Sequence, residues 1–125
     1  MRRLETQLRE NPESTFLKGL KQRMDYNSPL SMKVTFQYFK QVRDEKLEDQ
    51  NVYLCDWYLQ QIMFDHFSDN SKAGMKAIFG GSTKRGDRPA WVPSTLEAVT
   101  EDMLEEAFDF SKFEKRTYLN QRLLQ

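Results

Sequence analysis

Cysteine and histidine each occur once in this 125-residue sequence, as Cys55 and His66, and this scarcity excludes several kinds of site. One cysteine cannot form an intramolecular disulfide or a cysteine-rich zinc site. Cys55 has no evident base near it and is expected to be a small packed residue. His66 is expected at a helix end, where a histidine is common for structural reasons. We predict no catalytic residue, no cofactor site and no metal site.

Long apolar runs and an excess of one charge are also missing. No stretch approaches the roughly 18 apolar residues that a membrane span needs, so no membrane contact is predicted. Lys plus Arg number 19 and Asp plus Glu number 19, which makes the net charge zero. A neutral chain is a poor general nucleic-acid binder, because such affinity comes from neutralising phosphates.

Branched residues of the kind that favour sheets are few, since Val and Ile together number 5 + 2 = 7. Leu, Phe, Met and Tyr dominate the apolar set instead and favour helices. Apolar residues make up only 38% of the chain, yet aromatic residues reach 13%. A short helical chain cannot easily bury that many aromatic side chains against itself, so a partner surface is expected.

Four sequence signals predict helix starts. Asn11-Pro12 and Ser28-Pro29 each place a capping residue before a proline, which loses no hydrogen bond at the first helical position. Ser94 to Glu97 has the form of a capping box. Thr100 precedes two acidic residues, which are favourable in a first turn.

Apolar periodicity divides the chain between these signals. The expected segments are a short helix through Leu4 and Leu8, a helix from 11 to 26, a long helix from 29, a polar connection over 43–51, a helix over 52–67, a turn-rich break over 68–74, a short apolar piece over 75–79, a loop over 80–87 and a helix from 100 to 108. Residues 32–38 also alternate like a strand, but the Ser-Pro start and the length of the run favour a helix.

Two segments have a more specific pattern. Residues 28–35 read SPLSMKVT, and residues 88–100 read RPAWVPSTLEAVT. In the same order they resemble the C-terminal region of the 3-hydroxyisobutyryl-CoA hydrolases, a branch of the crotonase (enoyl-CoA hydratase/isomerase) superfamily. The family has Ser-Pro-Thr-Ser-Leu-Lys-Val-Thr, then Asn-Pro-Lys-Trp-Lys-Pro and Leu-Glu-Glu-Val-Thr. Residues 56–59 (DWYL) and 74–77 (GMKA) resemble two further family elements.

This resemblance implies an all-α fold that corresponds to the C-terminal helical part of a crotonase-type α/β fold. It implies a crotonase-like region over residues 1–108 and a tail extension over 109–125. The family's catalytic Glu, Asp and oxyanion glycines lie in an N-terminal spiral of ββα units, which has no counterpart here, so the chain is expected not to be an enzyme. Ala73 stands where the family has an acidic residue, and residues 78–81 replace another family run, which argues against CoA binding.

The resemblance also suggests a setting, because hydrolase-like proteins of this family occur in the mitochondrial small ribosomal subunit of several eukaryotic lineages. We predict a mitochondrial, non-catalytic structural subunit of that particle, bound to a separate chain with the N-terminal crotonase half and to neighbouring ribosomal proteins. Two alternatives stay open: one chain of a split, still active acyl-CoA hydrolase, and a free-standing helical adaptor.

Two sets of residues are candidates for contacts with partners. The basic residues could form a face that touches rRNA phosphates, although a solvated face is the simpler interpretation. They are Arg2, Arg3, Arg9, Lys84, Arg85 and Arg88. The apolar residues of the tail are expected to dock on a neighbouring protein rather than on this chain. They are Phe110, Phe113, Tyr118, Leu119, Leu123 and Leu124.

Overall fold

The computed structural model describes residues 2–45, 49–80 and 87–111. Within these ranges the chain forms six α-helices and no strand, which confirms the all-α prediction. The helices are α1 (Arg2–Glu10), α2 (Thr15–Tyr26), α3 (Pro29–Glu45), α4 (Asp49–Asp65), α5 (Ser68–Phe79) and α6 (Glu101–Ala107). None of the described helices is both long and apolar enough to cross a bilayer.

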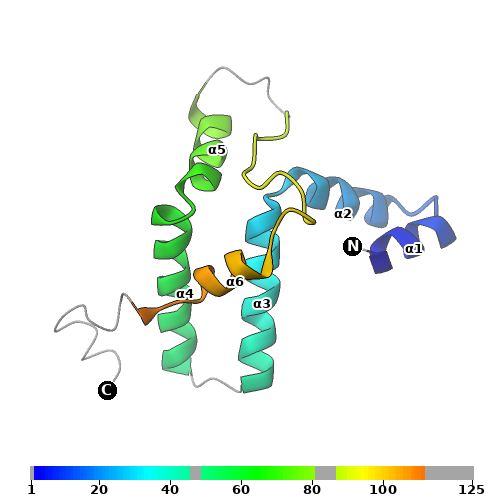
Figure 1. Ribbon diagram of the computed structural model, residues 1–125. Helices are drawn as coiled ribbons and strands as arrows, with labels where there is room; N and C mark the ends of the chain where they lie inside the picture. Colours follow the sequence, from blue (N-terminus) through cyan, green and yellow to red (C-terminus); the bar gives the residue numbers. More distant parts are fainter. Residues whose placement is uncertain (1, 46–48, 81–86, 112–125) are drawn as a thin grey trace.

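The helices form a small body and an arm (Figure 1). The long helices α3 and α4 run in opposite directions, α5 follows α4 at one end, and α6 lies across α3 and α4. Helices α1 and α2 pack against each other as a hairpin, the arm, which extends away from α3. The segment 87–100 returns from α5 past the start of α3 to reach α6.

Hydroxyl side chains start three of the helices. The Ser28 Oγ accepts a hydrogen bond of 3.2 Å from Ser31 N, directly before Pro29, and the Thr100 Oγ1 accepts one of 3.2 Å from Met103 N. Both predicted starts are therefore confirmed. The start predicted at Asn11 is wrong, because the Asn11 backbone N–H closes α1 on Gln7 O. Ser14 caps α2 instead and accepts a bond of 3.3 Å from Leu17 N.

Residues 68–74 are helical, so the turn-rich break predicted there is wrong. Ser and Asn favour turns because their side chains compete for local backbone groups. Here the side chains have other partners. The Ser71 Oγ donates a hydrogen bond of 2.7 Å to Met63 O, and the Asn70 Oδ1 accepts one from the Ser28 Oγ. The polar connection predicted over 43–51 is shorter than expected, since α3 ends at Glu45 and α4 begins at Asp49.

The predicted capping box at Ser94 does not start a helix. The Thr95 Oγ1 accepts a hydrogen bond of 3.2 Å from Ala98 N, and Val99 N donates to Leu96 O, so this segment forms a local turn. Residues around Trp91 are neither helical nor in a strand, in agreement with the extended stretch that two flanking prolines predict.

The core lies where α6 crosses α3 and α4. Leu30 and Val34 of α3, Leu59 of α4, Val99 and Ala107 form one buried cluster. Tyr58 and Ile62, on a neighbouring face of α4, form a second small cluster. This core is small, and it holds the body together mainly through one side of α3 and α4.

Candidate interaction surface

The chain exposes more large apolar side chains than it buries apolar residues. Twelve are exposed among the described residues, whereas eight apolar residues are buried. The exposed ones are Phe16, Leu20, Tyr26, Phe36, Phe39, Tyr53, Trp57, Phe64, Met75, Ile78, Phe79 and Val92. Soluble monomers rarely expose large continuous apolar areas without a binding role, so these side chains indicate an interaction surface.

One hollow of 460 Å³ lies between α3, α4 and α5. Val34 and Leu59 of the core line it together with Tyr38, Phe64 and Met75. Five residues of α4, four of α3 and four of α5 line it together with Trp91, and no described residue of α6 takes part. The hollow is therefore a gap that α6 does not fill.

The Tyr38 hydroxyl at the wall of this hollow is fixed by a hydrogen bond to α4. It donates this bond, of 2.9 Å, to Val52 O. Burial, followed by the nearby Asp56 carboxylate, raises the pKa of Tyr38 above its usual value. The hydroxyl therefore remains protonated and keeps its role as a donor between α3 and α4.

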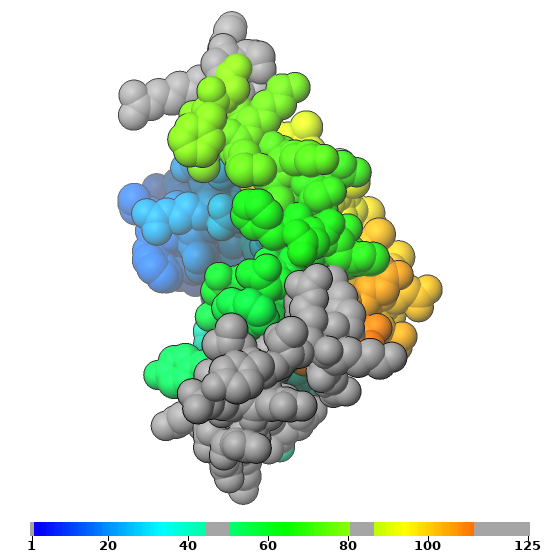
Figure 2. All heavy atoms as spheres, turned by 90° about the vertical axis from the view of Figure 1, so that its left-hand side faces the viewer, coloured from blue at the N-terminus to red at the C-terminus, as the bar shows by residue number. Residues whose placement is uncertain are grey.

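Two further hollows adjoin the first around the circumference of α3, on the side of the arm. One, of 730 Å³, shares Ser31, Thr35 and Trp91 with the first, and the other, of 560 Å³, shares Met24, Met32 and Phe36 with the second. We call the three together the α3 groove. Figure 2 shows α6, in orange, on one flank of α4 and the blue residues of the arm towards the other. Met24 of α2 lines both of these hollows, which therefore lie beside the arm, and no residue of α6 lines them.

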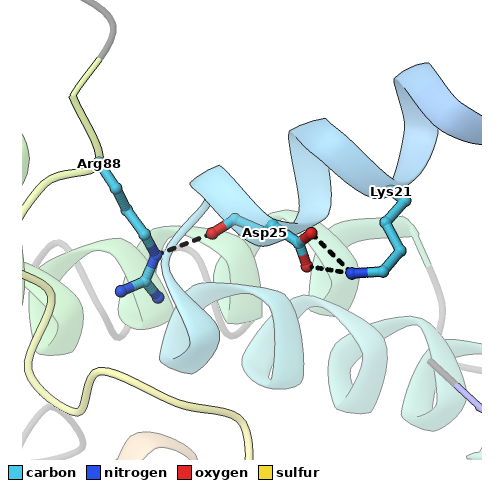
Figure 3. A network of polar contacts seen from close by, with 3 residues as sticks. All are labelled: Lys21, Asp25 and Arg88. Atoms are coloured by element: carbon cyan, nitrogen blue, oxygen red, sulfur yellow. Dashed lines mark hydrogen bonds and ion pairs between the residues drawn. The ribbon is translucent and has the colours of Figure 1, made fainter.

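The arm is held in place by segment 87–100. The Arg88 Nε donates a hydrogen bond of 2.8 Å to Asp25 O at the end of α2, and its Nη2 donates one of 2.6 Å to Ser94 O. The Trp91 Nε1 donates one of 2.8 Å to Tyr26 O. Figure 3 shows Arg88 reaching the backbone of Asp25, whose carboxylate faces Lys21 on the other side. Arg88 thus has a structural role that its prediction as an RNA contact did not include.

Arg88→Lys is expected to loosen the arm. The lysine keeps the positive charge but cannot reach two carbonyls with a planar fork, so the free energy of unfolding falls by about 1 kcal/mol. Backbone amides at the end of α2 should also exchange with solvent faster. Arg9→Lys, the same change at an exposed position of α1, is the control and should change neither quantity. Equal behaviour of the two variants in urea unfolding and hydrogen exchange would contradict this role.

The remaining basic candidates fall into three groups. Arg2 and Arg3 line the hollow beside Met24 and Met32, whereas Arg9 is exposed outside the α3 groove. Lys84 and Arg85 lie outside the described residues. The structure therefore joins Arg2 and Arg3 to an apolar surface, an association that the sequence did not suggest.

Phe110, the first predicted contact residue of the tail, packs within the chain. Its ring centroid lies 5.2 Å from that of Tyr58, and it packs against both core clusters. The expectation that the segment from residue 109 onwards avoids its own chain is therefore wrong for this residue. The other five predicted tail contacts, Phe113, Tyr118, Leu119, Leu123 and Leu124, lie outside the described residues.

The lone histidine links two helices. His66 Nε2, just after α4, lies 2.8 Å from Glu106 Oε2 on α6, and both side chains are about half exposed. This position at a helix end agrees with the predicted structural role. Among the described residues, no three His, Cys, Asp or Glu side chains gather in a way that could hold a metal ion.

These features define a helical region with a small apolar core, many exposed apolar side chains and three hollows around α3. The family model for enoyl-CoA hydratase/isomerase matches residues 1–108. The chain therefore belongs to the enoyl-CoA hydratase/isomerase family, and the predicted membership of the crotonase superfamily is confirmed. No curated protein and no solved structure matched the chain.

Proposed function

We propose that this chain is a non-catalytic structural subunit of a larger assembly, in which a partner protein covers its exposed apolar surface. The excess of exposed over buried large apolar side chains carries this proposal. Phe16 and Phe36, for example, are 76% and 72% exposed. Burying one such side chain stabilises a complex by about 1.5–3 kcal/mol, so a few of them are enough to hold a partner.

The arrangement of polar groups supports a role without catalysis. Hydrolysis of a thioester needs donors aimed at the developing oxyanion and a carboxylate or histidine that handles water. In the described part of the chain, the His66–Glu106 pair is half exposed and lies outside the α3 groove. The charged residues of the groove are Asp56 in one hollow and Arg2, Arg3, Lys33 and Glu97 in another, and no histidine or cysteine lines any of the three.

The proposed assembly is the small subunit of the mitochondrial ribosome. This step is supported by the resemblance of residues 28–35 and 88–100 to the 3-hydroxyisobutyryl-CoA hydrolases, and by the family match over residues 1–108. The proposed main partner is a protein with the ββα part of the same fold, because its apolar surface is the natural cover for these helices. Neighbouring ribosomal proteins are proposed as further contacts.

Purification of the tagged chain from its own cells tests this proposal. The chain should sediment with the mitochondrial small subunit in a sucrose gradient, and mass spectrometry should find a crotonase-like protein in the same fraction. The fraction should not hydrolyse 3-hydroxyisobutyryl-CoA above the level of particles that lack the chain. An untagged strain is the control for adventitious binding.

Two results would overturn the proposal. Hydrolase activity that co-purifies with the chain and a partner would favour a split, active enzyme. A monomer that sediments alone and melts cooperatively at high temperature would favour a self-sufficient adaptor, since such a chain would need no partner to complete its core.

A further inference from the structure

We propose that residues 112–125 of this chain cover an exposed apolar side of α4. This side, the α4 strip, consists of Tyr53, Trp57 and Phe64. The inference goes beyond the proposed function, because it assigns the strip to the chain itself and leaves the exposed side chains of the arm, α3 and α5 to partners. Each of the two proposals can therefore fail while the other stands.

The α4 strip has a regular helical spacing. Tyr53, Trp57 and Phe64 follow one another at intervals of four and seven residues, which places them on one side of α4. They are 76%, 45% and 60% exposed. Ile62, on the opposite side, is 1% exposed and belongs to the core. The helix therefore has an exposed apolar side as well as a buried one.

The described chain ends close to this strip. The ring centroid of Phe110 lies 5.2 Å from that of Tyr58, which in turn lies 5.5 Å from that of Trp57. Figure 1 shows the chain running from α6 across α4 towards its described end. From Tyr58, the two ends of the strip at Tyr53 and Phe64 are about 8–9 Å away along the helix. The 14 residues from 112 to 125 extend about 20 Å even as a helix, so they can reach the whole strip.

Charge favours residues 112–125 as the occupant. Helix α4 contains three Asp and no Lys or Arg, and residues 101–111 contain five acidic and no basic residues. The adjacent end of α3, residues 40–45, has two basic and two acidic residues and leaves this balance unchanged. Residues 112–125 contain four basic residues and one acidic residue, a net charge of 4 − 1 = +3. The surroundings of the strip therefore attract this segment.

The arm also exposes apolar side chains, but its charge is unfavourable. Phe16 and Leu20 of α2 are 76% and 38% exposed, yet α2 contains three basic residues and one acidic residue. Residues 112–125 would meet like charge there, which is repulsive. At the α4 strip they meet opposite charge and apolar surface together. Their own apolar residues are Phe113, Tyr118, Leu119, Leu123 and Leu124.

Photo-crosslinking of the tagged chain in its own cells tests this placement. A benzoylphenylalanine replaces Tyr118 in one version of the chain and Leu123 in another, and the products are digested with trypsin. Because no Lys or Arg lies between Lys46 and Lys72, all of α4 is recovered in one peptide, residues 47–72. Both positions should crosslink to this peptide, and on a denaturing gel the product should keep the size of one chain.

Other crosslinks would overturn the inference. These are products with another protein, with RNA, with a second copy of the chain, or with the tryptic peptide 10–18 around Phe16. If residues 112–125 crosslink to a neighbouring protein while the chain still sediments with the mitochondrial small subunit, the inference fails and the proposed function stands. If they crosslink to residues 47–72 while the chain sediments alone, the proposed function fails and the inference stands.

Paired variants of the full chain test the apolar contact. Leu119→Ser together with Leu123→Ser should raise the hydrogen-exchange rates of the α4 backbone amides about three- to tenfold, because the strip loses its cover. The amides of α2 should not change. Asn120→Ser together with Gln121→Ser, at polar positions of the same segment, is the control and should leave α4 as it is. Equal exchange of α4 in the two double variants would contradict the contact.

A second pair of variants tests the charge preference. Lys115→Gln together with Arg116→Gln should raise the exchange rates of α4 about two- to threefold at low salt, and this difference should shrink at high salt. Arg9→Gln together with Lys18→Gln removes the same charge from the arm and should have no such effect on α4. An effect that is equally large for both pairs, or that salt does not reduce, would overturn the assigned charge complementarity.

Discussion

Leu30→Ala is expected to lower the free energy of unfolding by about 3 kcal/mol. Leu30 is fully buried, at 0% exposure, in the cluster where α6 crosses α3 and α4. The truncation removes the apolar contacts of the side chain and leaves a cavity that the surrounding helices fill only partly. A whole domain is typically stable by only about 5–15 kcal/mol, so this one change removes a large share of the total.

Urea unfolding, monitored by far-ultraviolet circular dichroism, measures this loss of stability. Leu20→Ala provides the matched control, because Leu20 on α2 is 38% exposed and belongs to neither core cluster. The control should cost less than about 1 kcal/mol. If Leu30→Ala and Leu20→Ala shifted the midpoint equally, the core would not lie at the crossing of α6 with α3 and α4.

Asn70→Ala is expected to cost about 2 kcal/mol, because it breaks a buried polar pair. The Ser28 Oγ donates a hydrogen bond of 2.8 Å to the Asn70 Oδ1, and the two residues are only 5% and 3% exposed. The pair joins the start of α3 to α5 across 42 residues of sequence. Without the amide, the Ser28 hydroxyl proton is left buried with no acceptor, and α5 loses its polar contact with α3.

Thermal unfolding of three variants separates this pair from simpler effects. Asn51→Ala, at an exposed position of α4, should change stability little. Ser28→Ala should also cost the cap of α3, about 1 kcal/mol. The double variant with Asn70→Ala should then be less destabilised than the sum of the two single changes. Strict additivity would show that the two side chains do not interact.

The helix starts that depend on neighbouring residues could be predicted from sequence. Ser28 and Thr100 each cap a helix through an amide three residues later, so the whole interaction lies within one short segment. The alternating pattern over residues 32–38 also fits a strand, but the Ser28-Pro29 start and the length of the run predict the helix α3 that is found. The surplus of aromatic residues also predicted unburied apolar surface, and the exposure of Phe16 and Phe36 agrees with that prediction.

Features that depend on distant partners could not be predicted in this way. From sequence alone, Asn70 favours a turn, so the first half of α5 was predicted as a break. Its hydrogen bond with the distant Ser28, which the sequence does not show, occupies the side chain instead. The sequence predicts Phe110 as a tail residue that contacts another protein. Only the fold places it against Tyr58 and the core clusters. Arg2 and Arg3 likewise lie beside apolar residues of α2 and α3 only because α1 packs back against α2 in the hairpin of the arm.

The hydrogen bonds that hold the arm determine which of its positions tolerate substitution. Arg88 and Trp91 donate to the main-chain carbonyls of Asp25 and Tyr26, and every amino acid supplies such a carbonyl. Replacements at positions 25 and 26 therefore leave both hydrogen bonds available. Replacements at positions 88 and 91 remove a donor side chain that few residues can imitate. The angle of the arm is thus tolerant to mutation on one side of the contact and sensitive on the other.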